Sequence, residues 1–130
     1  MKITPALALV LSLSLVGATL VAQEPVRSLF SKDLVGVPSK ELTMITVEYQ
    51  PGESTPAHTH HAQAVLYVLE GSVVMQVKGQ PPVTLGPGQT WYEGPDDMHV
   101  VSRNASNSAP AKYLVFLVKD KGAPLLTPVK

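Results

Sequence analysis

The stretch from His58 to Gly71 reads HTHHAQAVLYVLEG and decides the fold. Its second half, residues 64–70, is rich in strand-forming residues and ends at a glycine, a common turn residue. Its first half holds three of the four histidines of the chain, and the fourth is His99. Residues two apart in an extended strand point to the same face, so His58 and His60 are expected to direct two imidazoles at one point. This arrangement favours a transition-metal ion, with solvated loop histidines as the alternative.

Short apolar runs separated by Gly and Pro continue on both sides of this stretch, and none shows sustained helical periodicity. Many short strands at such spacing predict an all-β sandwich or barrel. The segment 25–39 is irregular and offers one further edge strand, while 122–130 is expected to be an extended arm. The strands expected with most support are 42–49, 64–70, 73–77, 83–85, 90–93, 98–103 and 113–119.

Residues 1–22 have the features of a secretory signal peptide. Lys2 supplies a short positive region, residues 5–16 are apolar apart from two serines, and small residues precede Gln23. A membrane anchor is the alternative, but the apolar run is short for a spanning helix and no basic cluster follows it. We therefore expect a single domain over residues 23–130, periplasmic or secreted, with no membrane contact after signal cleavage.

The composition excludes several classes of partner and chemistry. The chain of 130 residues is long enough for one domain, and its ten Lys and Arg balance its ten Asp and Glu. Removing Lys2 leaves nine basic and ten acidic residues, which gives no electrostatic case for binding nucleic acid. There is no cysteine, so thiol chemistry is excluded and imidazole and carboxylate are the only strong transition-metal ligands.

Two groups of residues resemble the two motifs of the cupin superfamily, in particular its small secreted single-domain members. Gly52, His58-Thr59-His60 and the strand end YVLEG over residues 67–71 resemble the first motif. Gly86-Pro87-Gly88, Gly94-Pro95, His99 and Asn104 resemble the second. The resemblance implies a double-stranded β-helix, or cupin jelly roll, around a metal. It also implies a divalent ion (iron, manganese, nickel, zinc or copper) held by three histidines and one glutamate.

Carried over residue by residue, the resemblance makes His58, His60 and His99 the metal ligands. His99 lies one residue nearer Pro95 than the family pattern has it. The asparagine expected four residues after it is likewise displaced to Asn104, a shift that a β-bulge could absorb.

The family glutamate would fall on Ala64, which offers no ligand atom. Gln63 is adjacent and is a further candidate ligand, but strand parity points it and His61 away from the site. We expect three histidines plus water, with open positions for a substrate. Loss of the metal altogether is the alternative.

Other residues are weaker candidates. Arg103 shares strand parity with His99, so it could pair with a substrate carboxylate or enolate, with an exposed strand-end arginine as an equal alternative. Tyr67 and Trp91 are candidates for substrate binding, although such aromatics more often fill a core or a dimer interface. Glu93 could point inward, but a solvated strand residue is the favoured interpretation.

These residues predict a metal-binding cupin that acts on a small molecule. The first hypothesis for its chemistry is a dioxygenase-like reaction on an enolic or phenolic substrate. One alternative is a non-catalytic, metal-poor module that binds a small ligand. Another is a metal-independent isomerase of the sugar-epimerase type, for which the sequence shows no evident base besides the histidines. A homodimer is expected, because exposed sheet edges tend to be paired or covered.

Overall fold

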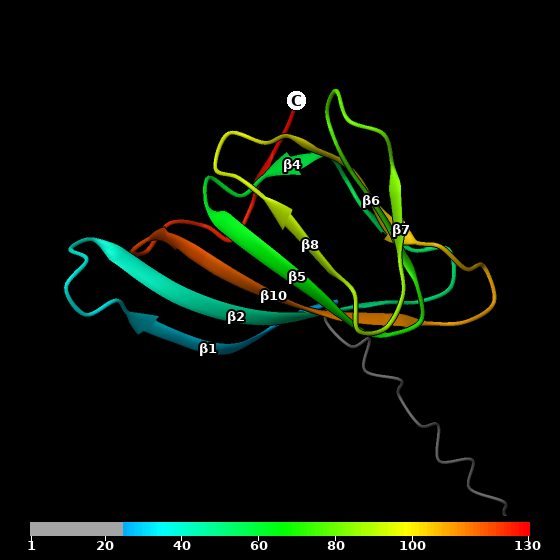
Figure 1. The fold of residues 1–130 in the computed structure, drawn as a ribbon, viewed down its shortest axis with the longest axis horizontal. Coiled ribbons are helices and arrows are strands. Elements are labelled where there is room, and N and C mark those ends of the chain that lie inside the picture. The colour runs from blue at the N-terminus through cyan, green and yellow to red at the C-terminus, as the bar shows by residue number, and fades with distance from the viewer. Residues whose placement is uncertain (1–24) are drawn as a thin grey trace, which may run out of the picture.

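The computed structural model of the chain describes residues 25–130, which form two antiparallel sheets and no helix (Figure 1). The first sheet has the order β1 (Val26–Asp33), β2 (Lys40–Tyr49), β10 (Ala111–Asp120), β5 (Gln63–Glu70), β8 (Thr90–Glu93). The second has the order β11 (Thr127–Pro128), β4 (His58–Thr59), β9 (His99–Asn104), β6 (Val73–Val77), β7 (Val83–Leu85), with β3 (Ser54–Thr55) also paired to β9. The all-β prediction is confirmed.

The sequence alternation in β5 sets which face of the first sheet is buried. Ala64, Leu66 and Val68 are buried, while the side chains between them are exposed. This is the period of two that a strand with one solvated face requires. The core lies between the sheets and consists of Ile45, Val47, Tyr49, Ala62, Ala64, Leu66, Val68, Val73, Met75, Leu85, Ala111, Tyr113, Val115 and Leu117.

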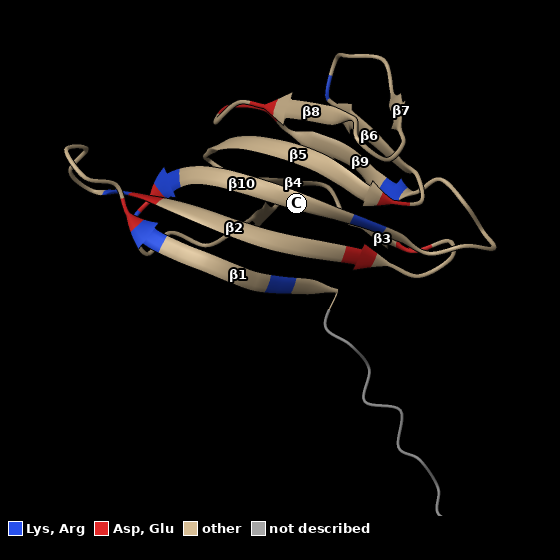
Figure 2. Ribbon diagram, turned by 60° about the horizontal axis from the view of Figure 1, so that its bottom comes forward, with Lys and Arg blue, Asp and Glu red and all other residues tan. Residues whose placement is uncertain are grey.

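The outer face of the first sheet is also apolar, although it is exposed. Cross-strand pairing forms one row of side chains over all five strands: Phe30, Met44, Phe116, Val65 and Tyr92. The charged residues of these strands lie at the strand ends, and the strand centres carry none (Figure 2). Exposed apolar patches of this kind on small proteins mark interaction surfaces.

The C-terminal segment is a strand partner rather than a free arm. Thr127 and Pro128 pair with β4, and the Val129 amide donates to the Ala57 carbonyl at 3.0 Å. The segment thereby closes the outer edge of the second sheet beside the histidine strand, as Figure 1 shows in red.

The predicted signal peptide, residues 1–22, lies outside the described residues and stays a prediction. Within residues 25–130, no helix is long and apolar enough to cross a membrane.

Candidate metal centre

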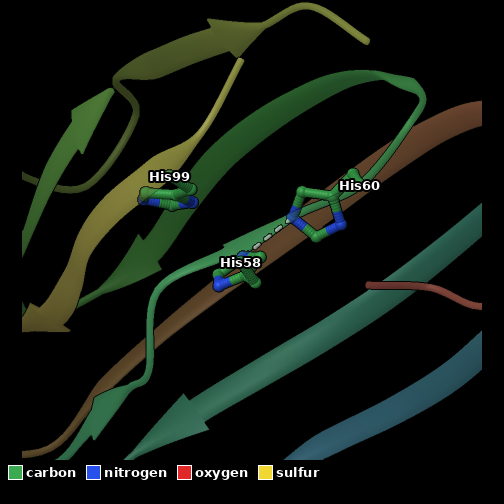
Figure 3. Close-up of side chains that lie close together, drawn as sticks. All are labelled: His58, His60 and His99. Atoms are coloured by element: carbon green, nitrogen blue, oxygen red, sulfur yellow. Dashed lines mark hydrogen bonds between the residues drawn. The ribbon is translucent and has the colours of Figure 1, made fainter. Parts of the chain in front are cut away.

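Three of the four histidines meet between the two sheets. His58 and His99 lie directly opposite each other on β4 and β9, and both are buried. His60 follows β4, and one ligand atom from each of the three histidines lies within 4.8 Å of the others. Figure 3 shows the three rings turned toward one another. The structure thus brings together all three predicted ligands.

Hydrogen bonds fix which nitrogen of two of these rings faces the centre. His58 Nδ1 lies 2.8 Å from the carbonyl oxygen of Pro56, and His60 Nδ1 contacts the carbonyl oxygen of Leu125. A carbonyl can only accept, so each Nδ1 carries the donated proton. The Nε2 atoms of His58 and His60 therefore face each other, 3.2 Å apart. Carbonyls placed in this way commonly orient metal-binding histidines.

A carboxylate completes the cluster. Glu93, at the end of β8, is 4% exposed, and its Oε1 lies 2.9 Å from His60 Nε2. Its Oε2 lies 3.2 Å from His99 Nδ1. The sequence interpretation of Glu93 as a solvated strand residue is therefore wrong. The sequence signal that could have identified Glu93 is its spacing from Trp91. The two residues lie two apart in one strand, so their side chains point to the same, inward face.

Among the described residues, the only buried side-chain polar atoms without a hydrogen-bond partner are Glu93 Oε2 and both ring nitrogens of His99. A buried polar group without a partner costs about 1–3 kcal/mol. All three atoms belong to this one cluster. The two facing Nε2 atoms and the carboxylate also bring electron-rich atoms together, an arrangement that either a proton on His60 or a metal ion stabilises. The donor set and these orphaned atoms fit a divalent transition metal.

The pKa values of the histidines reflect burial and the charge of Glu93. Burial lowers the pKa of His99 to about 4, and burial also lowers the pKa of His58. Burial opposes protonation of His60 as well, but the hydrogen bond and charge of Glu93 raise its pKa above the ordinary value. Two neutral imidazoles are thus available as ligands near neutral pH, because a metal binds the neutral ring.

A cavity of about 170 Å³ adjoins the cluster. Half of the sixteen described residues that line it are aliphatic, and none of them is Lys or Arg. Trp91 forms part of the wall, with its ring centroid 4.9 Å from that of His99. The lining residues are Val26, Ile45, Val47, Thr55, His58, His60, Ala64, Leu66, Trp91, Glu93, His99, Ser102, Tyr113, Val115, Leu125 and Leu126.

The structure places the other sequence candidates outside this cavity. Gln63 and Tyr67 lie on the exposed outer face of β5. His61 is exposed and has a positive φ of 49°, so the chain turns there and its ring contacts Thr59 Oγ1 at 3.0 Å. Arg103 is exposed and donates to the Asn104 carbonyl at 3.1 Å. Of the predicted substrate-binding residues, only Trp91 lines the cavity.

A β-bulge explains both the displaced second motif and the position of Arg103. The pairing of β6 with β9 matches Gln76 to Val101 and then Val77 to His99, which leaves Val100 as an extra residue. The extra residue reverses the parity after His99, so Ser102 points inward and Arg103 outward. Asn104 is also turned inward.

Asn104 is 1% exposed, and its side-chain amide donates to the carbonyl of Ala109 at 2.8 Å and to that of Gln50 at 3.1 Å. Its Oδ1 accepts from the Ser106 amide at 2.9 Å. Asn104 therefore holds the loop after β9 against the end of β2, which is a structural role.

Comparison with known proteins places this geometry in a family. The family described as Cupin domain matches residues 45–117. A search of curated proteins found no match.

Solved structures share the fold. The DMSP lyase DddQ from Ruegeria pomeroyi DSS-3 is 25% identical with a TM-score of 0.60, over 68% of this chain and 43% of the lyase. TT1209 from Thermus thermophilus is 30% identical with a TM-score of 0.54, over 64% of this chain and 76% of TT1209. An uncharacterized protein with a double-stranded β-helix domain from Klebsiella pneumoniae is 19% identical with a TM-score of 0.56, over 68% of this chain and 75% of that protein. The predicted double-stranded β-helix is confirmed. The chain spans less than half of the lyase.

Proposed function

The chain belongs to the cupin family, and from this premise we propose that it holds a divalent transition metal on His58, His60 and His99 and acts on a small molecule in the adjoining cavity. The observation that carries the proposal is the convergence of the three histidines, each of which brings one ring nitrogen within 4.8 Å of the others. Ligand atoms about 2.1 Å from an ion, at right or tetrahedral angles, lie about 3 to 3.5 Å apart. The 3.2 Å between His58 Nε2 and His60 Nε2 agrees with that spacing.

The residues of the chain prepare this site in two ways. The carbonyls of Pro56 and Leu125 fix two imidazoles with Nε2 toward the centre. The aliphatic walls exclude water, which strengthens electrostatic interactions at the site. A divalent transition metal bound there would supply Lewis acidity and, for iron, manganese or copper, redox chemistry.

The cavity favours a substrate that is largely apolar and carries one or two oxygen atoms. Aliphatic side chains form half of the wall, Trp91 offers an aromatic face, and none of the described lining residues is a Lys or Arg that could pair with a carboxylate. Tyr113 also lines the cavity, and burial raises the pKa of its hydroxyl, which stays neutral and donates to the Tyr49 hydroxyl at 3.2 Å. An enolic or phenolic substrate matches this surface. We therefore keep a dioxygenase-like reaction, with dioxygen as co-substrate, as the proposed chemistry.

The cavity wall and the uptake of metal also distinguish the two alternative functions, a sugar isomerase and a non-catalytic binding module. A sugar substrate has many hydroxyl groups, and each needs a polar partner when it is buried. Apart from the three histidines and Glu93, the polar residues among the described lining residues are Thr55, Ser102 and Tyr113, so the structure gives the sugar-isomerase alternative little support. A non-catalytic binding module would be favoured by a site that takes up no metal.

Metal analysis of the purified protein tests the proposal. We expect close to one iron, manganese, nickel, zinc or copper ion per chain in the wild type and a large loss in the His58→Ala variant. Dioxygen uptake with a catechol or an enol would then test the reaction. A wild-type protein that none of these ions fills would contradict the proposal and favour the binding module.

We also propose that a second copy of the chain covers the apolar outer face of the first sheet. The charges that border this face are paired within one chain, Lys112 with Glu48 at 2.6 Å and Lys40 with Asp120 at 2.7 Å. An identical face would therefore meet little charge repulsion in a two-fold dimer. Light scattering should give a dimer for the wild type and a monomer for Phe116→Glu, and a monomeric wild type would refute this.

Export to the periplasm or medium also remains part of the proposal. Mass spectrometry of the exported protein tests it, and an intact Met1 would contradict signal cleavage.

A further inference from the structure

Ala64 and Glu93 face each other on neighbouring strands. The antiparallel register of β5 and β8 pairs the two residues directly, and both are buried and line the cavity. Side chains at directly opposed positions share one face of a sheet, with Cβ atoms about 5 Å apart. The resemblance would place the family glutamate at position 64. That position lies directly opposite Glu93, which is not part of the first motif.

Glu93 faces the ring nitrogens of two histidines. Oε1 contacts His60 Nε2 at 2.9 Å, and Oε2 is buried, lies 3.2 Å from His99 Nδ1 and forms no hydrogen bond. Burying a carboxylate is unfavourable unless it is paired or coordinates a metal. No lysine or arginine is found among the described residues that line the cavity around it.

At His60, the geometry distinguishes a carboxylate that binds the metal directly from one that only orients a ligand. An orienting carboxylate accepts a proton from the ring nitrogen that does not bind the metal. In His60 that nitrogen is Nδ1, and it already donates to Leu125. Glu93 instead faces Nε2, the only nitrogen of His60 left for a metal. When a metal takes the place of a proton on His60 Nε2, the Oε1 atom of Glu93 faces the same ion.

This inference rests on the metal-binding function proposed above. We propose that Glu93 is the fourth protein ligand, so that the carboxylate has moved from β5 to the facing position on β8. The glutamate on β8 then explains why Ala64 is small: a longer side chain there would occupy the space of the Glu93 carboxylate. A carboxylate reduces the net charge of a divalent site from two to one. The site therefore favours neutral or singly charged oxygen groups over dianions.

The first experiment compares metal affinity in Glu93→Gln and Glu93→Ala with the wild type, using Co²⁺ titration followed by absorbance and calorimetry. Glu93→Gln keeps the shape and loses the charge, so it controls for misfolding. Loss of a group that only orients a ligand typically costs 10–100-fold in metal affinity, and loss of a ligand should cost at least about 100-fold. The visible bands of bound Co²⁺ should also change, because a carboxylate leaves the coordination sphere. The matched control is Glu48→Gln, on the outer face, which should leave affinity and spectrum unchanged.

The second experiment moves the carboxylate back. The double variant Glu93→Ala with Ala64→Glu should recover affinity to within about tenfold of the wild type, because the paired positions reach the same point. Wild-type affinity in both Glu93 variants, with metal lost only in His58→Ala, would overturn the Glu93 inference and leave the proposed function standing. A wild type that binds no Co²⁺ would overturn both.

Discussion

Two buried polar clusters line the same cavity, and they differ in how their polar atoms are satisfied. In the first, the hydroxyl of Tyr49 contacts Thr55 at 2.6 Å, Ser102 at 2.8 Å and Tyr113 at 3.2 Å. In the second, formed by His58, His60, His99 and Glu93, three buried atoms have no hydrogen-bond partner. The first cluster is complete within the chain, whereas the second leaves polar atoms available to a cation. The difference separates polar groups that stabilise the barrel from polar groups that serve a ligand.

The largest effect is expected from His99→Leu. The substitution removes a ligand, so bound metal should fall from near one per chain to near zero. It also removes two buried nitrogens without partners, so the metal-free variant should match or exceed the metal-free wild type in free energy of unfolding, by about 1 kcal/mol. Metal analysis and urea unfolding after chelation measure the two quantities. Retained metal would show that the histidine cluster is not the site.

A smaller loss is expected from removing residues 125–130. The truncation deletes the Leu125 carbonyl that orients His60, and it deletes β11, the neighbour of β4. Metal affinity should fall about 10–100-fold, as it does when other groups that orient a metal ligand are lost. Circular dichroism must show an intact sheet signal for the comparison to hold. The alternative outcome, unchanged affinity in a folded variant, would mean that β4 alone orients the ring.

Tyr49→Phe should lower the free energy of unfolding and leave metal binding intact, which is the reverse of the effect expected for His99→Leu. It removes the hydroxyl shared by Thr55, Ser102 and Tyr113 and leaves their polar atoms without that partner. The free energy of unfolding should fall by about 1–3 kcal/mol, while metal affinity should stay within about twofold. Chemical unfolding and Co²⁺ titration on the same preparation test this. A parallel loss of metal would show that the two clusters are coupled.

Local patterns predicted the all-β class and the pairing of His58 with His60, whereas His99 and the jelly roll followed from the resemblance to the two cupin motifs. Alternation in residues 64–70 determines which face of β5 is buried, and the HxH spacing places two rings together. Glu93 was missed because a cross-strand register is not local: its pairing with Ala64 depends on a turn and another strand. The inward and exposed orientations of Arg103 were left equal, because the displaced second motif indicated a bulge without fixing its position, which the structure places at Val100.

The smallest effect is expected from Arg103→Ala, and it tests the bulge. If the parity after His99 were regular, Arg103 would point at the cavity and its loss would weaken substrate or anion binding. In the structure Arg103 is exposed and donates to the adjacent Asn104 carbonyl, while Ser102 takes the inward position and bonds to Tyr49. Arg103→Ala should therefore change stability by no more than about 0.5 kcal/mol, as exposed substitutions do. Metal affinity, and turnover once a substrate is found, should also be unchanged. Thermal melting and Co²⁺ titration measure this, with Ser102→Ala as the matched inward control, which should lower stability. A marked loss of ligand binding in Arg103→Ala would place the arginine in the cavity and contradict the register of β9.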